Sequence, residues 1–121
     1  MKVTIRITKT FKAAAKPLLK KYHSFSTDLL KLEKDLLKTP RLGTPLGQDT
    51  FKIRLKIASK GKGKSGGARV ISLIETTLIA IAEFTSEEDI TINLVFIYDK
   101  ADTENISDKE LKDLIKSFKN D

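Results

Sequence analysis

The stretch that decides the fold is FKIRLKI, residues 51–57. Apolar residues at 51, 53, 55 and 57 alternate with three cations, Lys52, Arg54 and Lys56. This two-residue period is typical of a β-strand with one buried face. Same-face side chains lie about 6.5–7 Å apart along a strand. The stretch therefore predicts a sheet with two different faces. One face is basic, and the other is apolar and must be covered by other elements.

The chain that follows predicts two more strands. Residues 59–67, SKGKGKSGG, hold four glycines and indicate an irregular loop. Residues 69–84 are β-branched and apolar, which predicts one long strand, bent or bulged near Glu75–Thr77. Residues 86–89 supply the turn, and residues 90–98, ITINLVFIY, form the last strand. These strands are consecutive, so we expect an antiparallel meander.

The remaining segments predict a first strand and three helices. Val3, Ile5 and Ile7 alternate with polar residues over 3–8, which indicates a strand. Two amphipathic helices follow up to Thr39, with a kink or break at Pro17, and are expected to form a hairpin. Residues 40–50 are rich in proline and glycine and indicate a loop. Ser107 and Glu110 form a capping box for a C-terminal helix. The expectation is an α+β fold of order β-α-α-β-β-β-α, its antiparallel sheet packed against the helix hairpin and the C-terminal helix.

Composition excludes several classes of protein. The 121 residues contain no cysteine and one histidine, which excludes disulfide frameworks, thiolate catalysis and histidine-rich metal sites. No apolar run approaches the ~18 residues of a membrane span. The N-terminus, MKVTIRIT, alternates and lacks a signal-peptide core. We expect a single cytoplasmic domain over residues 1–121, with no metal, no cofactor and no membrane association.

Charge is distributed unevenly along the chain. Residues 1–27 hold seven basic residues and no acid, and residues 51–70 hold seven more and no acid. Residues 71–121 hold five basic and twelve acidic residues, and the whole chain carries +7. Two concentrated basic segments favour a polyanionic partner. The alternative is that these lysines and arginines lie on solvent-exposed faces and bind no partner.

The basic strand face is the first candidate site. Cations so close together lower one another's pKa, so a lysine such as Lys52 or Lys56 can exchange protons near neutrality. Arg69 opens the next strand beside this face and can bind phosphate bidentately. Tyr98 and Lys100 end the last strand, where a tyrosine can stack on a base or carry a proton. An exposed polar sheet face and a rim tyrosine are the structural alternatives.

The glycine-rich loop is the second candidate. It is no Walker motif, because Ala58 stands where the first glycine is required and a strand follows instead of a helix. Its three interleaved lysines, Lys60, Lys62 and Lys64, and its backbone N–H groups favour phosphate binding. With Lys56, they are the predicted RNA-binding residues.

Six stretches together resemble the HigB-like branch of the RelE/ParE-type toxins of bacterial toxin–antitoxin systems. The similarity covers nearly the whole chain, and residues 59–71 are its most specific part. The stretches are KKYHSFSTDL (20–29), GTPLG (43–47), KIRLKI (52–57), SKGKGKSGGARVI (59–71), IYDK (97–100) and ISDKEL (106–111).

The resemblance implies a RelE-like fold and a small basic ribonuclease that cuts mRNA in the ribosomal A site. It implies attack by the ribose 2′-OH, which gives a 2′,3′-cyclic phosphate and a 5′-hydroxyl. The implied partners are the ribosome, mRNA and a helix-turn-helix antitoxin. The positions that match the family's functional residues are Lys52, Arg54, Arg69 and Lys100, and Tyr98 is the nearest tyrosine to the family's C-terminal one.

Three points stay open at this level. Ile106 stands near the position where some members carry that tyrosine, and residues 74–90 are longer than usual, so the general acid and base are unassigned. A ParE-like poison of DNA gyrase shares the same fold, and fold alone does not decide function. A non-catalytic RNA-binding module is the third alternative.

Overall fold

The computed structural model describes residues 2–60, 67–82, 85–103 and 105–120 of the chain. The described elements combine strands and helices in an α+β arrangement, with three α-helices and one five-stranded sheet. In chain order they are β1 (Val3–Ile7), α1 (Lys9–Lys21), α2 (Phe25–Lys38), β2 (Thr44–Gly47), β3 (Thr50–Leu55), the short 3₁₀ helix η1 (Ala58–Lys60), β4 (Ala68–Ala82), β5 (Thr85–Asp99) and α3 (Asp108–Asn120).

The sheet is mixed, which corrects the expectation of a purely antiparallel one. Its strand order is β1-β5-β4-β3-β2, and β1 pairs in parallel with β5 while the other pairs are antiparallel. Val3 lies opposite Ile90 and Ile7 opposite Leu94. The alternation in 3–8 indicates a strand with one buried face, but it contains no signal for the neighbour or direction of that strand.

The expectation of a simple loop over 40–50 was wrong, because β2 lies within it. β2 is the edge strand beside β3. Gly43, just before it, has φ +107°, and a Cβ there would lie 2.5 Å from the carbonyl oxygen of Lys52. Gln48 and Asp49 both have positive φ and turn the chain into β3. Gly43, one of the glycines that indicated a loop, is thus the residue that lets this edge strand approach β3 closely.

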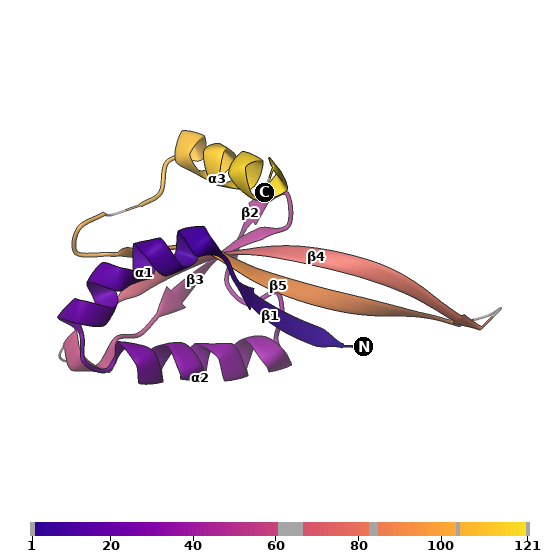
Figure 1. Cartoon of the computed structure of the whole chain (residues 1–121), viewed down its shortest axis with the longest axis horizontal. Coiled ribbons are helices and arrows are strands. Elements are labelled where there is room, and N and C mark those ends of the chain that lie inside the picture. Colours follow the sequence, from indigo (N-terminus) through magenta and orange to yellow (C-terminus); the bar gives the residue numbers. More distant parts are fainter. Residues whose placement is uncertain (1, 61–66, 83–84, 104, 121) are drawn as a thin grey trace.

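The long strand predicted over 69–84 is present as β4, but its details differ from the prediction. Register shifts lie at Ile71/Ser72 and Ala80/Ala82, not near 75–77. Residues 86–89, predicted as the turn, belong to β5 and pair with 77–80. β4 pairs with β3 only over residues 68–73, and β5 pairs with β1 only over residues 90–94. In the rest of their described length, β4 and β5 pair with each other alone. Figure 1 shows this hairpin projecting well beyond the helices.

The helix predictions are largely confirmed. α1 runs through Pro17 without a break, and the Thr8 hydroxyl caps it by accepting from the Phe11 N–H at 3.2 Å. The capping box of α3 is formed: the Glu110 N–H donates to Ser107 Oγ at 3.1 Å. Within the part of the chain that the structure describes, no helix is both long and apolar enough to cross a membrane.

The sheet has two covered faces, here called the α1–α2 face and the α3 face. α1 packs on β5, and α2 contacts β1 and β3. Their apolar residues form one core with the strand residues on that face, including Ile53, Val70 and Leu94. A smaller core on the other face joins Ile71 and Tyr98 to Ile115 of α3. α2 and α3 accordingly lie on opposite sides of the sheet in Figure 1.

Candidate functional site

Three of the predicted site residues lie in one line across three strands. Arg54 of β3 is directly opposite Arg69 of β4, and Arg69 is directly opposite Tyr98 of β5. Lys52 lies one step further along β3, opposite Ile71. All of them belong to the α3 face, because the alternate residues of β3 enter the α1–α2 core. We call Lys52, Arg54, Arg69 and Tyr98 the cationic row.

Arg69 is the most enclosed cation of this row. It is only 9% exposed, and its Nη1 donates to the Ala68 carbonyl oxygen at 3.1 Å. Directly opposed residues of an antiparallel pair have Cβ atoms about 4.5–5.5 Å apart. The Cβ atom of Arg54 therefore lies close to that of Arg69. Delocalised charge and weak hydration make arginine the cation best suited to such a position. This crowding of like charge is electrostatically unfavourable in the absence of an anion.

Tyr98 supplies the neutral member of the row. It is buried, and its ring lies 6.4 Å from that of Phe96. Its hydroxyl has no hydrogen-bond partner of good geometry among the described residues. Burial raises the pKa of Tyr98 above its usual value, although the nearby backbone of Ile106 and the Arg69 guanidinium oppose the rise. The phenol is therefore protonated at neutral pH and can donate a proton, whereas it is a poor base.

The connection between β5 and α3 lies over part of the row. Lys52 Nζ donates to Asn105 Oδ1 at 3.1 Å, and Ile106 packs in the same apolar cluster as Tyr98. The basic face is consequently less open than expected, because Arg69 and Tyr98 are buried and Lys52 is half-buried. Arg54 and Lys56 are exposed. Because β2 pairs with β3 only as far as Lys52, both also border an open groove of about 270 Å³ on the α2 side, which Asp28 and Asp35 line as well.

Lys60, predicted to bind RNA, lies instead in a charged cluster on the α1–α2 face. Its Nζ is 2.8 Å from Asp99 Oδ1 and 3.2 Å from the Gly67 carbonyl oxygen, and its side chain is 12% exposed. The Tyr22 hydroxyl donates to Asp99 Oδ2 at 2.6 Å, and Lys21 Nζ is 3.6 Å from the same oxygen. We call these four residues the Asp99 cluster. Lys60 is therefore already neutralised by a carboxylate.

Asp99 is strongly ionised in this setting. Burial alone would raise its pKa, but hydrogen bonds from Lys60, Tyr22 and the Ala101 backbone N–H lower the pKa to about 2. The sequence prediction did not include this residue. The signal was available in retrospect, since Asp99 is the acid nearest to the loop lysines at the end of the last strand.

A second carboxylate holds the start of the glycine-rich loop. Asp28 of α2 is buried, and its Oδ2 accepts from Ser24 Oγ at 2.7 Å and from the Ala58 N–H at 3.1 Å. The Ser59 N–H donates to Ser24 Oγ at 2.9 Å. Both stems of the loop are thus fixed, one by Asp28 and one by the Asp99 cluster. The other two loop lysines of the prediction, Lys62 and Lys64, lie outside the described residues.

Lys100 follows β5 at the base of the same loop. Its backbone N–H donates to the Gly67 carbonyl oxygen at 3.1 Å, and its side chain is half-buried. The structure therefore brings Lys52, Arg54, Arg69 and Tyr98 together on one face and sets Lys100 at the end of that face, next to the fixed loop stem.

The functional groups of the described site are basic side chains and one phenol. Among the described residues, no cluster of three or more His, Cys, Asp or Glu side chains is arranged to hold a metal ion. Comparison with protein-family models, curated proteins and solved structures gave no match to this chain.

Proposed function

We propose that this protein is an endoribonuclease that cuts mRNA on the ribosome, as the toxin of a toxin–antitoxin pair of the RelE/ParE type. The observation that carries the proposal is the alignment of Arg54, Arg69 and Tyr98 across three adjacent strands. The sequence resemblance described above supports the same assignment, and we extend the proposal to a RelE-like topology of the fold.

The proposed reaction requires two proton transfers, one from the ribose 2′-OH and one to the departing 5′-oxygen. The ribose 2′-oxygen attacks the adjacent phosphorus and loses its proton, and the 5′-oxygen leaves with a proton. The products are a 2′,3′-cyclic phosphate and a 5′-hydroxyl. Negative charge grows on the non-bridging oxygens in the transition state, where Arg54 and Arg69 would be preorganised donors.

The protonated state of Tyr98 supports a role as the general acid. Its raised pKa keeps the proton available at neutral pH, and the hydroxyl is buried beside the Arg69 guanidinium. The 2′-OH proton would pass to water, and the Lys52 ammonium group would be a third donor to the phosphate oxygens. This group donates to Asn105 Oδ1, so Asn105 would have to release it when RNA binds.

The proposed partners follow from the same assignment. The ribosome and mRNA supply the phosphate groups, and a helix-turn-helix antitoxin would block the cationic row. The toxin would act in the cytoplasm, where the ribosome is, and it needs no cofactor for this chemistry.

The deciding experiment is brief induction in a bacterial host, followed by genome-wide mapping of mRNA 5′ ends and of DNA breaks. We expect new 5′-hydroxyl ends at a fixed position within codons. DNA breaks without new RNA ends would support a gyrase poison instead. RNA retention on the ribosome without cleavage would support a plain RNA-binding module.

A further inference from the structure

A second group of cations surrounds a pocket away from the cationic row. The pocket has a volume of about 730 Å³ and lies where β1, the start of α1 and the end of α3 meet. Four cations line it, and one acid, Glu75, stands among them. The lining residues are Arg6, Ile7, Thr8, Lys9, Lys12, Glu75, Phe118 and Lys119.

The cations of this pocket outnumber its acids by four to one among the described lining residues. Arg6, Lys9, Lys12 and Lys119 are all exposed, and none makes an ion pair with a described residue. Glu75 contributes one negative charge against these four positive ones, and its Oε1 accepts from Asn93 Nδ2 at 2.8 Å. Three separate elements thus bring basic side chains to one concavity, which is an arrangement suited to phosphate groups.

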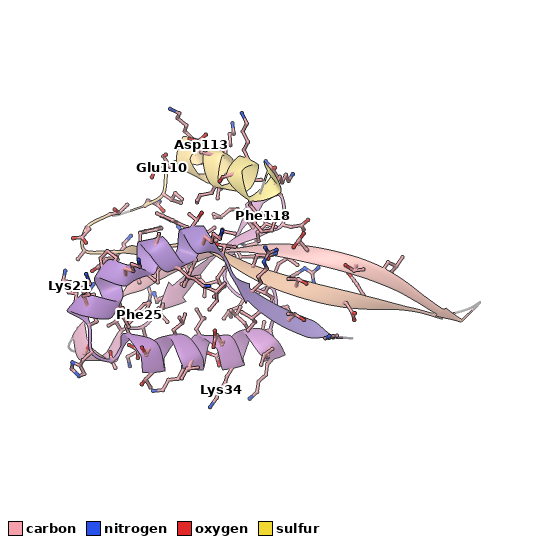
Figure 2. All side chains as sticks on the ribbon, in the orientation of Figure 1. Lys21, Phe25, Lys34, Glu110, Asp113 and Phe118 are labelled. Atoms are coloured by element: carbon pink, nitrogen blue, oxygen red, sulfur yellow. The ribbon has the colours of Figure 1, made fainter. Side chains whose placement is uncertain are left out.

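The pocket also offers a surface for an aromatic base. Phe118 is half-buried at the end of α3, and Figure 2 shows it between that helix and the sheet. Ligand pockets typically measure about 300–1,000 Å³, so the space accommodates one nucleotide. A cationic groove with an aromatic side chain is a common means of holding a nucleotide by its phosphate and its base.

We propose that this pocket binds a nucleotide, with the phosphate on Arg6, Lys9, Lys12 and Lys119 and the base against Phe118. The nucleotide is either free or part of a single-stranded RNA. The inference goes beyond the proposed cleavage and does not depend on it, because it concerns a different part of the surface and is tested by binding alone.

The test compares two variants with equal loss of charge. Arg6→Gln/Lys12→Gln removes two pocket cations, and Lys20→Gln/Lys34→Gln removes two exposed helical lysines outside the pocket lining. Binding of AMP, of ribose 5-phosphate and of a single-stranded RNA 12-mer is measured by titration calorimetry at low ionic strength. The loss of two hydrogen bonds to charged phosphate oxygens should weaken binding about 10-fold or more in the pocket variant and less than about 2-fold in the control.

Each arm identifies a different part of the proposal. AMP binding that the pocket variant weakens identifies a free nucleotide as ligand, and an effect on the RNA 12-mer alone identifies an RNA strand. Base stacking predicts that AMP binds about 10-fold more tightly than ribose 5-phosphate. Equal affinities would overturn the role of Phe118. Equal weakening by both double variants, or no binding of any ligand by the wild type, would overturn the site itself.

Discussion

Tyr98 and Asp99 are consecutive residues, yet their side chains enter opposite faces of the sheet and opposite electrostatic settings. Asp99 is surrounded by Lys60, Lys21 and the Tyr22 hydroxyl, so every group there has a partner. Tyr98 lies beside Arg69 on the face that also carries Arg54, and these three residues are aligned across three adjacent strands. The Asp99 cluster is explained by the stability of the folded chain. The cationic row places two arginines opposite each other on adjacent strands, and grouped like charges of this kind are often retained for binding or catalysis.

The sharpest way to test this contrast is to remove one hydroxyl from each side. Tyr98→Phe should lower the rate of RNA cleavage by about 10²–10⁴-fold, the usual contribution of a general acid. Its stability should be unchanged or slightly higher, because the lost hydroxyl has no hydrogen-bond partner of good geometry among the described residues. The two quantities are read from single-turnover cleavage on programmed ribosomes and from urea unfolding.

The matched control is Tyr22→Phe on the other face. It removes a hydrogen bond to an ionised carboxylate, so it should reduce the free energy of unfolding by about 1.5–3 kcal/mol. The cleavage rate of the folded fraction should stay at the wild-type level. Tyr98→Phe with full activity would remove Tyr98 from the mechanism, whatever the control shows.

Arg69 gives the next largest effect. Arg69→Ala should reduce cleavage by about 10²–10³-fold while the protein still folds, the usual result of losing one donor that stabilises developing charge. Arg69→Lys should restore only part of the rate, because lysine lacks the planar fork. Growth arrest and mRNA cleavage are compared with thermal melting of the same variants.

Lys60→Met is the control cation from the other face. It leaves Asp99 without its closest ion-pair partner, so it should melt at a lower temperature than the wild type and still cleave RNA when folded. If Arg69→Ala melts normally and cleaves at the wild-type rate, the cationic row is not the active site.

Much of this arrangement could be predicted from the sequence because it depends on local periodicity. The alternation in 51–57 predicted which side chains share a face, and the order of the strands placed Arg69 beside that face. Ser107 and Glu110 fixed the start of α3 through contacts three residues apart. In each case the determining interactions are short-range or follow from one strand lying next to the following one.

The parts that were missed depend on long-range contacts. The parallel pairing of β1 with β5 joins residues nearly ninety positions apart, and no local pattern encodes it. In the sequence, Lys60 is one of several similar loop lysines. Only its ion pair with Asp99 in the folded chain distinguishes it. The burial of Tyr98 likewise depends on a long-range arrangement, since Ile106 and Ile115 pack in the same apolar cluster.

The smallest effect expected concerns acid stability and belongs to the Asp99 cluster alone. The pKa of Asp99 is about 2 in the folded protein, against 3.8 as its ordinary value. A lowered pKa contributes stability that is complete above the unfolded value and is lost as the pH falls through the folded one. This shift corresponds to about 2 kcal/mol. None of the four residues of the cationic row is itself a carboxylate.

Asp99→Asn isolates this contribution, because asparagine resembles the protonated acid and all other carboxylates are shared with the wild type. The free energy of unfolding of the wild type should exceed that of the variant by about 2 kcal/mol near pH 6. The difference should fall to roughly half by about pH 3 and continue to shrink toward pH 2. Urea unfolding at a series of pH values measures it. A difference that stays constant as the pH falls would mean that Asp99 acts through shape or neutral hydrogen bonds. The contrast between the Asp99 cluster and the cationic row could then no longer be attributed to the charge of Asp99.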